Sequence, residues 1–382
     1  MLNTKIEQLL FNENERQKNE HNFIASENFV SDEVMRLCGS EFTNKYAEGY
    51  PGKRYYNGCN NYDDLENLGI KILTELYGCN FANIQPHCGA NANLAIFKAF
   101  LKPGDVILGM DLSAGGHLSH GSPANISGKW FDNNFYGVDE NGWLDYDKIQ
   151  QLANELKPKL IIAGASAYPR QINFKRFREI SDSVGSLLLV DMAHYSGLIA
   201  GGVYDSPLPY ADFVTSTTHK TLRGARGGMI LWNDDKYTKK INGGVFPGTQ
   251  GGPLMNQVAG KVQSFYEASQ PEFKEYVKNV VEMSQYMCEV FINNDIKITT
   301  DGTDSHIILI HTDKRSGADV ANDLEEKYNI VVNKNSIPND PRGVWETSGI
   351  RIGTAAMVTK KGNDRKYFHD IALNIVNTIK NK

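Results

Sequence analysis

The 382-residue sequence lacks a strong excess of either charge and lacks any long apolar run. Its 40 basic and 45 acidic side chains give a net charge of −5. This balance argues against a general nucleic-acid-binding protein, which would carry a basic stripe. No stretch approaches the roughly 18 apolar residues of a membrane span, and the polar segment 1–16 has no apolar core for a signal peptide. We therefore expect a cytoplasmic protein with no nucleic-acid and no membrane partner.

Cysteine is scarce and follows no recognisable spacing. The five cysteines are an odd number, and no two of them form a C-x-x-C pair. They therefore indicate reduced thiols and neither a disulfide framework nor a zinc site. A metal site built on Asp191 and His194 is a rival interpretation, but the sequence offers no evident third ligand. We expect no metal centre.

Glycine, in contrast, is abundant, with 35 residues, and part of them gather in five short clusters beside His, Lys, Arg or Tyr, at 49–58, 115–116, 224–228, 243–252 and 349–353. Glycine is used where the backbone needs a positive φ or where a ligand or another chain approaches closely. For any single cluster, a tight turn is the better explanation. Five clusters beside ionisable side chains favour a shared site.

Short apolar runs alternate with amphipathic stretches through the middle of the chain, which predicts an α/β domain with a parallel sheet. The predicted strands are Phe81–Gln85, Asp105–Met110, Leu160–Ala165, Leu187–Val190, Phe213–Thr217 and Met229–Trp232. The predicted helices between them are Asn61–Tyr77, Ala92–Leu101, Tyr146–Leu156 and Phe174–Val184. Beyond residue 260 the pattern predicts a long helix over 263–294, a strand at 305–311 and helices at 318–328 and 364–381. That part indicates a smaller α+β domain.

Ionisable residues follow several predicted strands, at the sheet edge where open parallel sheets bind their ligands. Lys220 precedes a glycine-rich arginine loop and could form a Schiff base if its pKa is lowered. Asp191 could hold a pyridine nitrogen protonated, and Gly89 before a helix offers N–H groups to a phosphate. Singly, Lys220 could be a surface lysine and Asp191 an N-cap. Together they describe pyridoxal phosphate.

Longer motifs give a specific resemblance. The chain resembles the serine hydroxymethyltransferase family, pyridoxal-phosphate enzymes of the aspartate-aminotransferase-like fold (fold type I). The motifs are Ile24–Asn28, Thr43–Tyr56, Gly115–Leu118, Val190–His194, Thr217–Thr221, Phe246–Gly248, Gln250–Pro253, Val332–Ser336 and Thr347–Gly353. The resemblance implies a mostly parallel seven-stranded sheet. It also implies an N-terminal arm over 1–45, a large pyridoxal-phosphate-binding domain over 46–262 and a small C-terminal α+β domain over 263–382.

The resemblance also assigns site residues. The catalytic residues would be Lys220, Glu48, Asp191, His117, Tyr56, Arg351 and His219. The cofactor, covalently held on Lys220, would contact Cys88, Gly89, Ala90, His117, Ser166, Asp191, His194, His219, Tyr46, Gly251 and Gly252. Ser26, Tyr56, Glu48 and Arg351 would bind the substrate. Leu112, Gly116, His117, Leu118, Tyr55, Asn335, Gly343, Val344 and Trp345 would line the folate site.

The activity implied is the interconversion of serine and glycine with tetrahydrofolate and methylenetetrahydrofolate, through an aldimine and a quinonoid of pyridoxal phosphate. Because Tyr46, Glu48 and Gly252 would come from a second chain, the resemblance implies a homodimer with shared active sites. A folate-independent aldolase or transaldolase that joins glycine to a larger aldehyde is the alternative. A catalytically idle relative is less consistent with retention of Lys220 and Asp191.

Of four features that depart from the family pattern, two segments lie in the expected site. The phosphate turn reads Cys88-Gly89-Ala90 where Ser-Gly-Ser is common, so two hydroxyl donors are absent and we expect weaker cofactor retention. The segment 341–345 replaces a Ser-Pro-Phe at the folate tail. The second departure is what leaves the aldolase alternative open.

Overall fold

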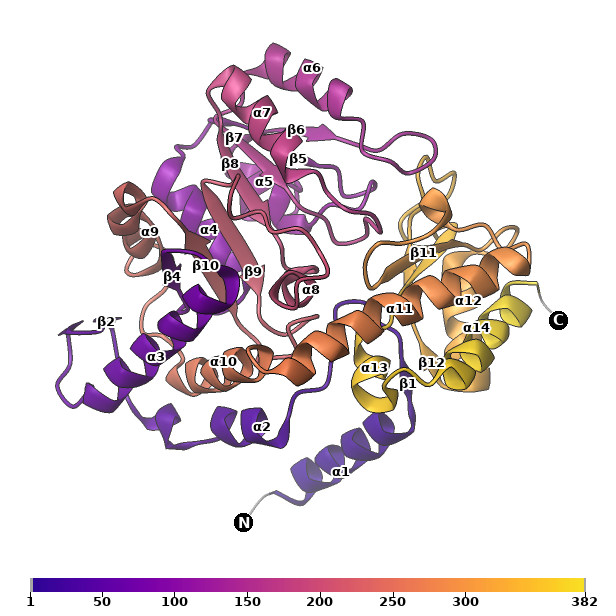
Figure 1. The fold of residues 1–382 in the computed structure, drawn as a ribbon, viewed down its shortest axis with the longest axis horizontal. Helices are drawn as coiled ribbons and strands as arrows, with labels where there is room; N and C mark the ends of the chain where they lie inside the picture. Colours follow the sequence, from indigo (N-terminus) through magenta and orange to yellow (C-terminus); the bar gives the residue numbers. More distant parts are fainter. Residues whose placement is uncertain (1–2, 381–382) are drawn as a thin grey trace.

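The computed structural model describes residues 3–380 and is built around a seven-stranded sheet (Figure 1). Its strands are β4 (Phe81–Asn83), β5 (Val106–Met110), β6 (Asp132–Tyr136), β7 (Leu160–Ala163), β8 (Leu187–Asp191), β9 (Phe213–Thr217) and β10 (Gly228–Trp232). The order across the sheet is β4-β10-β9-β8-β7-β5-β6. Only β10 runs antiparallel to its neighbours, and the other pairs are parallel. The mostly parallel seven-stranded sheet implied by the resemblance is confirmed.

The central strands form because their apolar runs can be buried on both faces, as parallel sheets require. Along β7, Leu160 and Ile162 belong to one hydrophobic cluster, while Ile161 and Ala163 belong to the other. Successive strand side chains point to opposite faces, so each run supplies both cores. The sequence analysis missed β6 because its polar segment at the sheet edge resembles a loop; in it only Tyr136 is buried.

Helices cover both faces of this sheet (Figure 1). They are α3 (Asn60–Tyr77), α4 (Gly89–Phe100), α5 (Ile126–Trp130), α6 (Tyr146–Leu156), α7 (Phe174–Val184), α8 (Ser196–Ala200) and α9 (Thr238–Val245). Asp145 and Asn173 cap the N-termini of α6 and α7 with their side chains, which explains why those starts were predictable. Helix α4 begins three residues before the predicted Ala92, so its first turn includes the glycine at 89.

The predicted helix over 263–294 is two helices, α10 (Met255–Ala268) and α11 (Pro271–Asn293). The break occurs because Pro271 occupies the first turn of α11, and a proline there disfavours helix in the preceding residue, Gln270, which is extended. The predicted boundary at 262/263 falls within α10. The division of the chain into an arm and two domains stays a prediction.

The C-terminal part adds a three-stranded antiparallel sheet ordered β11-β14-β13, with helices packed against it. Its elements are β11 (Ile307–His311), α12 (Gly317–Tyr328), β12 (Ile330–Val331), β13 (Asn333–Asn335), β14 (Gly349–Gly353), α13 (Ala355–Lys361) and α14 (Arg365–Ile379). The predicted helix 364–381 corresponds to α14, and its last residue lies outside the described residues.

The N-terminal segment joins both parts. Helix α1 (Thr4–Asn19) has no buried residue and lies at the edge of the molecule in Figure 1. Strand β1 (His21–Asn22) pairs in parallel with β12, and α2 (Asp32–Cys38) then packs against α10. A small hairpin of β2 (Gly49–Tyr50) and β3 (Lys53–Arg54) follows. Residues 24–28 therefore run between the seven-stranded sheet and the three-stranded sheet.

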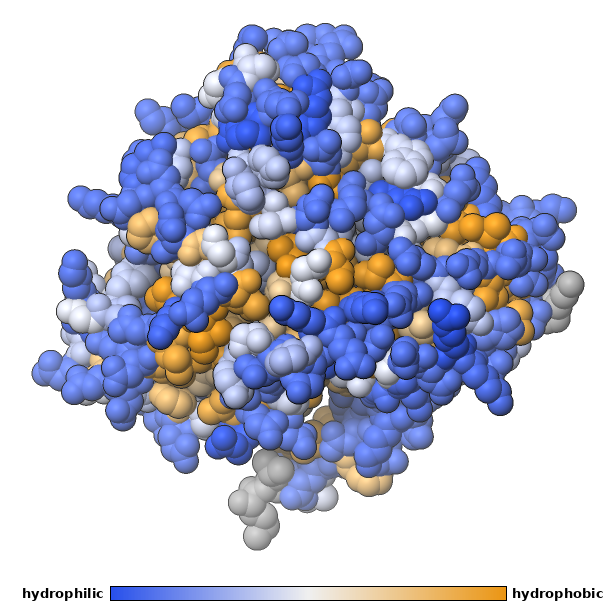
Figure 2. Space-filling view, viewed as in Figure 1, coloured by the Kyte–Doolittle hydropathy of each residue, from blue (hydrophilic) through white to orange (hydrophobic). Residues whose placement is uncertain are grey.

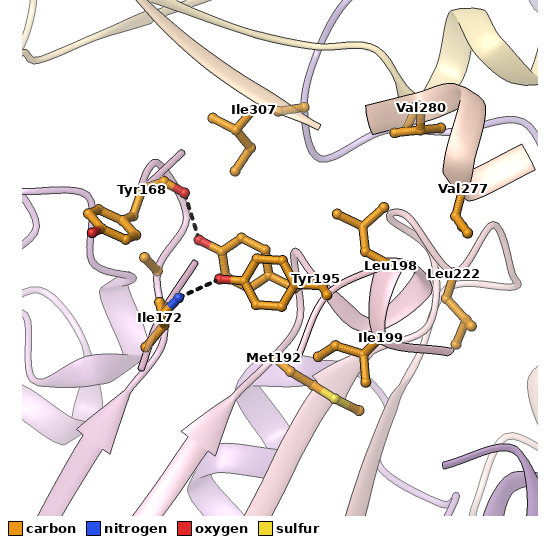
Figure 3. Close-up of a cluster of buried hydrophobic side chains, with 14 of the residues drawn as sticks. Tyr168, Ile172, Met192, Tyr195, Leu198, Ile199, Leu222, Val277, Val280 and Ile307 are labelled. Carbon is orange, nitrogen blue, oxygen red and sulfur yellow. Dashed lines mark hydrogen bonds between the residues drawn. The ribbon is translucent and has the colours of Figure 1, made fainter. Parts of the chain in front are cut away.

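A hydrophobic cluster connects the large sheet to α11 and β11 (Figure 3). Tyr195, four residues after the end of β8, is fully buried and donates its hydroxyl to the carbonyl of Tyr168 at 2.8 Å. Val277 and Val280 of α11 and Ile307 of β11 face the same cluster. The segment that follows β8 is therefore held in place by contacts with Tyr168, with α11 and with β11.

The face seen in Figure 2 is mainly hydrophilic, with hydrophobic side chains gathered in separate patches. Among residues 3–380, no helix combines the length and apolar character that crossing a membrane requires.

Candidate active site

The strand ends and the small sheet enclose a cavity of about 820 Å³. It is lined by many of the residues predicted from the sequence: Ser26, Cys88, Gly89, Ala90, Leu112, Gly116, His117, Leu118, Ser166, Asp191, His194, His219, Lys220, Asn335, Val344 and Arg351. The carboxyl ends of parallel strands meet at one edge of a sheet, which explains why residues so distant in sequence converge here.

Lys220 follows the end of β9 and is almost completely buried. Burial lowers the pKa of its ammonium to about 8, an effect that Asp191 opposes and that Arg351 reinforces. Its backbone carbonyl accepts a hydrogen bond from Nδ2 of Asn28 at 2.9 Å. A neutral amine, the nucleophilic form, is therefore accessible near neutral pH.

Asp191 ends β8, and its carboxylate is held by several donors. Oδ2 accepts from Nδ2 of Asn93 at 2.8 Å and lies 3.0 Å from Nε2 of His120, while Oδ1 accepts from the N–H of Ala193 at 3.1 Å. Burial raises the pKa of Asp191, but the hydrogen bonds from His120 and Asn93 outweigh this effect and hold the pKa well below its usual range. The carboxylate stays ionised and can stabilise a protonated ring nitrogen.

The sequence analysis missed His120 and Asn93. His120 lies two residues beyond the Gly115–Leu118 motif; its position three residues after His117 could have marked it as a candidate, although not its contact with Asp191. Nothing local marks Asn93, which lies 98 positions from Asp191. Potential ligand atoms of His117, His120 and Asp191 lie within 4.8 Å of one another. His120 and Asn93 both contact Oδ2 of Asp191, so the position of His120 is explained by a hydrogen bond that supports the carboxylate.

His117 precedes the short 3-10 turn Leu118–His120. Its Nδ1 lies 2.7 Å from Oγ of Ser119, and its ring centroid lies 5.5 Å from that of His120. Burial lowers the pKa of His117 to about 4, against the attraction of Asp191. A neutral imidazole thus lines the cavity, where it could stack on an aromatic ring.

The first turn of α4 lies at one end of the cavity and is a candidate anion-binding turn. Cys88 is its N-cap and makes no side-chain cap hydrogen bond; its Sγ lies 3.0 Å from Oδ1 of Asn91. A Cβ at position 89 would lie 2.7 Å from Cγ2 of Thr217, so only glycine fits there. Backbone N–H groups at the start of this 12-residue helix, together with its dipole, suit a phosphate.

Two further histidines border the cavity. Burial lowers the pKa of His194 well below its usual value and that of His219 to about 3, so both are neutral. Nδ1 of His194 lies 3.4 Å from Nε2 of His306, and Nδ1 of His219 accepts from the N–H of Gly227 at 3.4 Å. His306, which the sequence analysis did not identify, connects the end of β8 to β11.

Arg351 of β14 closes the cavity from the small sheet. Its Nη1 donates to the carbonyl of Ser166 at 2.7 Å and its Nη2 to Oδ1 of Asn333 at 2.8 Å, whereas its buried Nε has no partner. Burial lowers the pKa of Arg351 to about 10, which still leaves it charged at neutral pH. A buried guanidinium with an unused donor is suited to a carboxylate.

The remaining predicted residues do not line this cavity. Six of them form what we call the edge cluster: Tyr46, Glu48, Tyr55, Tyr56, Gly251 and Gly252. The other two, Gly343 and Trp345, flank Val344 in an exposed loop, where Trp345 is 81% exposed and only Val344 reaches the cavity. The expectation that all three loop residues line one site is therefore not met within a single chain.

The edge cluster is compact but open. The rings of Tyr46 and Tyr56 lie 5.4 Å apart, and Tyr55 packs edge-on against Phe246. A Cβ at Gly252 would lie 2.9 Å from the ring of Tyr46, and one at Gly251 would lie 3.5 Å from a carboxylate oxygen of Glu48. Although predicted from widely separated motifs, these residues share one surface.

Comparisons with known proteins agree with the geometry. A family model described as serine hydroxymethyltransferase matches residues 1–375. A serine hydroxymethyltransferase of Wolbachia pipientis subsp. Culex pipiens is 53% identical over 96% of this chain and 86% of its own length. Those of Polynucleobacter asymbioticus and Nitratiruptor sp. are 53% and 50% identical, covering 91% and 96% of this chain and 84% and 88% of their own lengths.

Proposed function

The chain belongs to the serine hydroxymethyltransferase family, and from that premise we propose which of its residues perform each part of the reaction. It is an enzyme that uses pyridoxal phosphate and interconverts serine and glycine, with tetrahydrofolate as co-substrate. The comparisons give no support to the aldolase alternative. The observation that carries the assignment of roles is the shared cavity of Lys220, Asp191 and Arg351.

The donor set of the cavity fits pyridoxal phosphate. The N–H groups of residues 89 and 90 would hold the phosphate, and Lys220 would hold the cofactor covalently. Oδ1 of Asp191 has an acceptor position left for the ring nitrogen, because only one N–H, that of Ala193, donates to it. His117 would contact the ring face. His194, His219 and Ser166 would border the rest of the cofactor.

When bound, pyridoxal phosphate accepts the electrons released as a bond at the substrate α-carbon breaks. Asp191 keeps the ring nitrogen protonated by remaining ionised. Arg351 binds the substrate carboxylate through its unpaired Nε–H and one Nη, and this contact sets which α-carbon bond is aligned for cleavage. Ser26, in the segment 24–28 between the two sheets, would contact the same substrate.

We propose that the edge cluster completes the cavity of a second copy of the chain in a homodimer. Its support is the exposure of Tyr46, Tyr55 and Tyr56, which are 59%, 75% and 45% exposed although aromatic. Glu48 would then exchange a proton with the substrate hydroxyl or with folate. Gly251 and Gly252 would bring backbone close to the phosphate across the interface.

The folate site would lie at the mouth of the cavity. Leu112, Leu118 and Val344 line the cavity and are each about half exposed or more, which leaves apolar surface for an aromatic ring system. Asn335 supplies an amide beside them, and Gly116 allows close approach. Tyr55 would reach the same mouth from the second copy.

We also propose a cytoplasmic location. All five cysteines are free, as expected for a protein kept in a reducing compartment. Cys79, Cys88 and Cys288 differ in burial but share this state.

A spectroscopic titration tests the proposed assignments. Purified holoenzyme receives glycine and then tetrahydrofolate while its visible spectrum is followed. We expect a cofactor band to change with glycine and to increase sharply on addition of folate. In parallel, borohydride reduction and peptide mapping should find the cofactor on Lys220. Attachment to another lysine, such as the exposed Lys236, would overturn the assignment.

A further inference from the structure

Lys261 of α10 is a fully buried lysine that the roles above do not use. Its Nζ donates to the backbone carbonyls of Ile84, Pro86 and Gly228, at 3.3 Å to each of the latter two. An ammonium has three donors and no acceptor, so three carbonyl oxygens satisfy it completely. The fold therefore provides a hydrogen-bond acceptor for each donor of this buried ammonium.

The carbonyls around Lys261 belong to the two segments that hold the proposed cofactor. Pro86 lies two residues before Cys88 of the phosphate-binding turn, and Gly228 ends the loop that follows Lys220. The N–H of Gly228 donates to the carbonyl of Pro86 at 2.9 Å, so the two segments already touch. Lys261 bonds to both sides of that junction.

The surroundings are shaped to receive the lysine. A Cβ at Gly227 would lie 2.7 Å from Cδ and 3.1 Å from Nζ of Lys261, so the glycine makes room for the stem and its charge. Burial lowers the pKa of Lys261 to about 7, and the buried carboxylate of Glu66 opposes this fall. The carbonyl oxygens also favour the ammonium, because only the charged form donates three hydrogen bonds.

A second, half-buried side chain supports the same segment. Nε2 of Gln250 donates to the carbonyl of Gln85 at 2.8 Å, and Oε1 of Gln250 accepts from the N–H of His87 at 3.3 Å. The carbonyls of residues 84, 85 and 86 are therefore each bound by a side chain. Of these two side chains, Lys261 is the one that also bonds to the loop after Lys220, and it adds to the backbone hydrogen bond between Gly228 and Pro86.

We propose that Lys261 is a positioning residue: a tethered cation that joins the phosphate-binding turn to the loop of the Schiff-base lysine and so sets how firmly the cofactor is retained. This role rests on the cofactor contacts proposed for Cys88–Ala90 and Lys220. Carbonyl oxygens arranged around a cation bind free monovalent cations in other settings. A small ammonium ion should therefore restore the junction when the side chain is removed.

The test removes the side-chain ammonium of Lys261 by mutation and then supplies a free alkylammonium ion in solution. Lys261→Ala should release pyridoxal phosphate at least about tenfold faster than wild type, the effect of losing a charged hydrogen-bond donor. Propylammonium, which matches the missing stem and charge, should slow that release severalfold. The neutral analogue 1-propanol should not. Release is followed by loss of cofactor absorbance after transfer to cofactor-free buffer.

Two variants separate this role from packing. Val262→Ala, on the same helix beside Gly69 and Ile84, removes buried apolar volume without removing a donor and should retain the cofactor. If Lys261→Ala does not fold well enough to measure, Lys261→Met keeps most of the stem and should show the same faster release. Equal release from the Val262 and Lys261 variants, or equal rescue by propanol, would overturn the proposal.

The outcome for Lys261 can be distinguished from that for the cofactor assignment by repeating the cation titration on cofactor-free protein. The melting temperature of apo Lys261→Ala should rise with propylammonium and not with propanol, whichever lysine binds the cofactor. If propylammonium raises the melting temperature of the variant but does not change its cofactor release, the positioning role is overturned and the cation site is supported. Absence of rescue in both measurements would overturn both parts.

Discussion

Lys220 and Asp191 lie buried in a cavity, whereas Glu48 and Tyr56 lie in a more exposed part of the same chain. Oδ2 of Asp191 lies within hydrogen-bonding distance of two side chains, and the pKa of Lys220 is shifted by burial. In the edge cluster the contacts are mainly between exposed aromatic rings. This difference in burial is the basis for our proposal that the edge cluster acts on the cavity of another copy.

The largest effect should come from removing the nucleophile of the cavity. Lys220→Ala should lower kcat by roughly a thousandfold or more, because a covalent role cannot be replaced by packing. Serine cleavage in the presence of tetrahydrofolate measures this loss. Exposed Lys236→Ala is the matched control and should keep wild-type activity; a comparable fall in both variants would refute the role of Lys220.

The division of labour between the two regions can be tested by mixing inactive chains. Lys220→Ala and Glu48→Gln should each be nearly inactive alone, but hybrid dimers contain one site with both wild-type residues. Random mixing should therefore recover about a quarter of wild-type activity, as follows from two-fold symmetry. Activity no higher than that of the parents, with hybrids demonstrated by mass spectrometry, would show that the two regions do not share a site.

The substrate end of the cavity depends on the geometry of a guanidinium. Arg351→Lys should lower kcat/KM for serine about thirty- to a hundredfold, because lysine keeps the charge but loses the forked pair of donors. Cofactor absorbance should remain unchanged, since Arg351 contacts the substrate. Loss of the cofactor in this variant would instead assign Arg351 to cofactor binding.

Burial in the cavity should also be visible as a pH dependence. Because the pKa of Lys220 is lowered to about 8, cofactor addition to apo protein should quicken about tenfold per pH unit below 8 and level off above it. The unfolded lysine keeps its proton up to about 10.5, so apo stability should rise with pH between these values. Lys220→Met should lose this rise. A titration centred near 10.5 would contradict a buried amine.

The smallest effect concerns the anion-binding turn. Cys88→Ser and Ala90→Ser each add a hydroxyl donor and should slow cofactor release about three- to tenfold. Cys38→Ser, half-buried outside the cavity, is the control and should change nothing. Release as slow in the parent protein as in these variants would mean that the backbone N–H groups of α4 suffice.

Local sequence predicted the parts of the site that sit at strand ends. Asp191 ends an apolar run that must be buried, and Lys220 follows a predicted strand of Phe, Val, Thr and Ser; both strand ends are visible in the sequence. The edge strand β6 and the break between α10 and α11 were missed. A polar edge strand looks like a loop, and the amphipathic pattern continues past Pro271 even though the helix does not.

The residues that support the site could not be predicted in this way. Asn93 and His120 reach Asp191 across 98 and 71 positions, and Lys261 bonds to carbonyls 175 and 177 positions away at Pro86 and Ile84. A carbonyl leaves no mark on the side-chain pattern, so such contacts appear only once the chain is folded.

The sequence by itself determined the predicted strands, which follow from periodicity, and the chemistry open to Lys220 and Asp191, which follows from side-chain type; the role of Arg351 came from the resemblance of its motif. The tertiary structure decided that the predicted residues separate into a buried cavity and the edge cluster. It also decided that Lys261 joins two loops through their backbones. Both outcomes depend on which distant segments become neighbours, and that is set by packing the whole chain around its sheets.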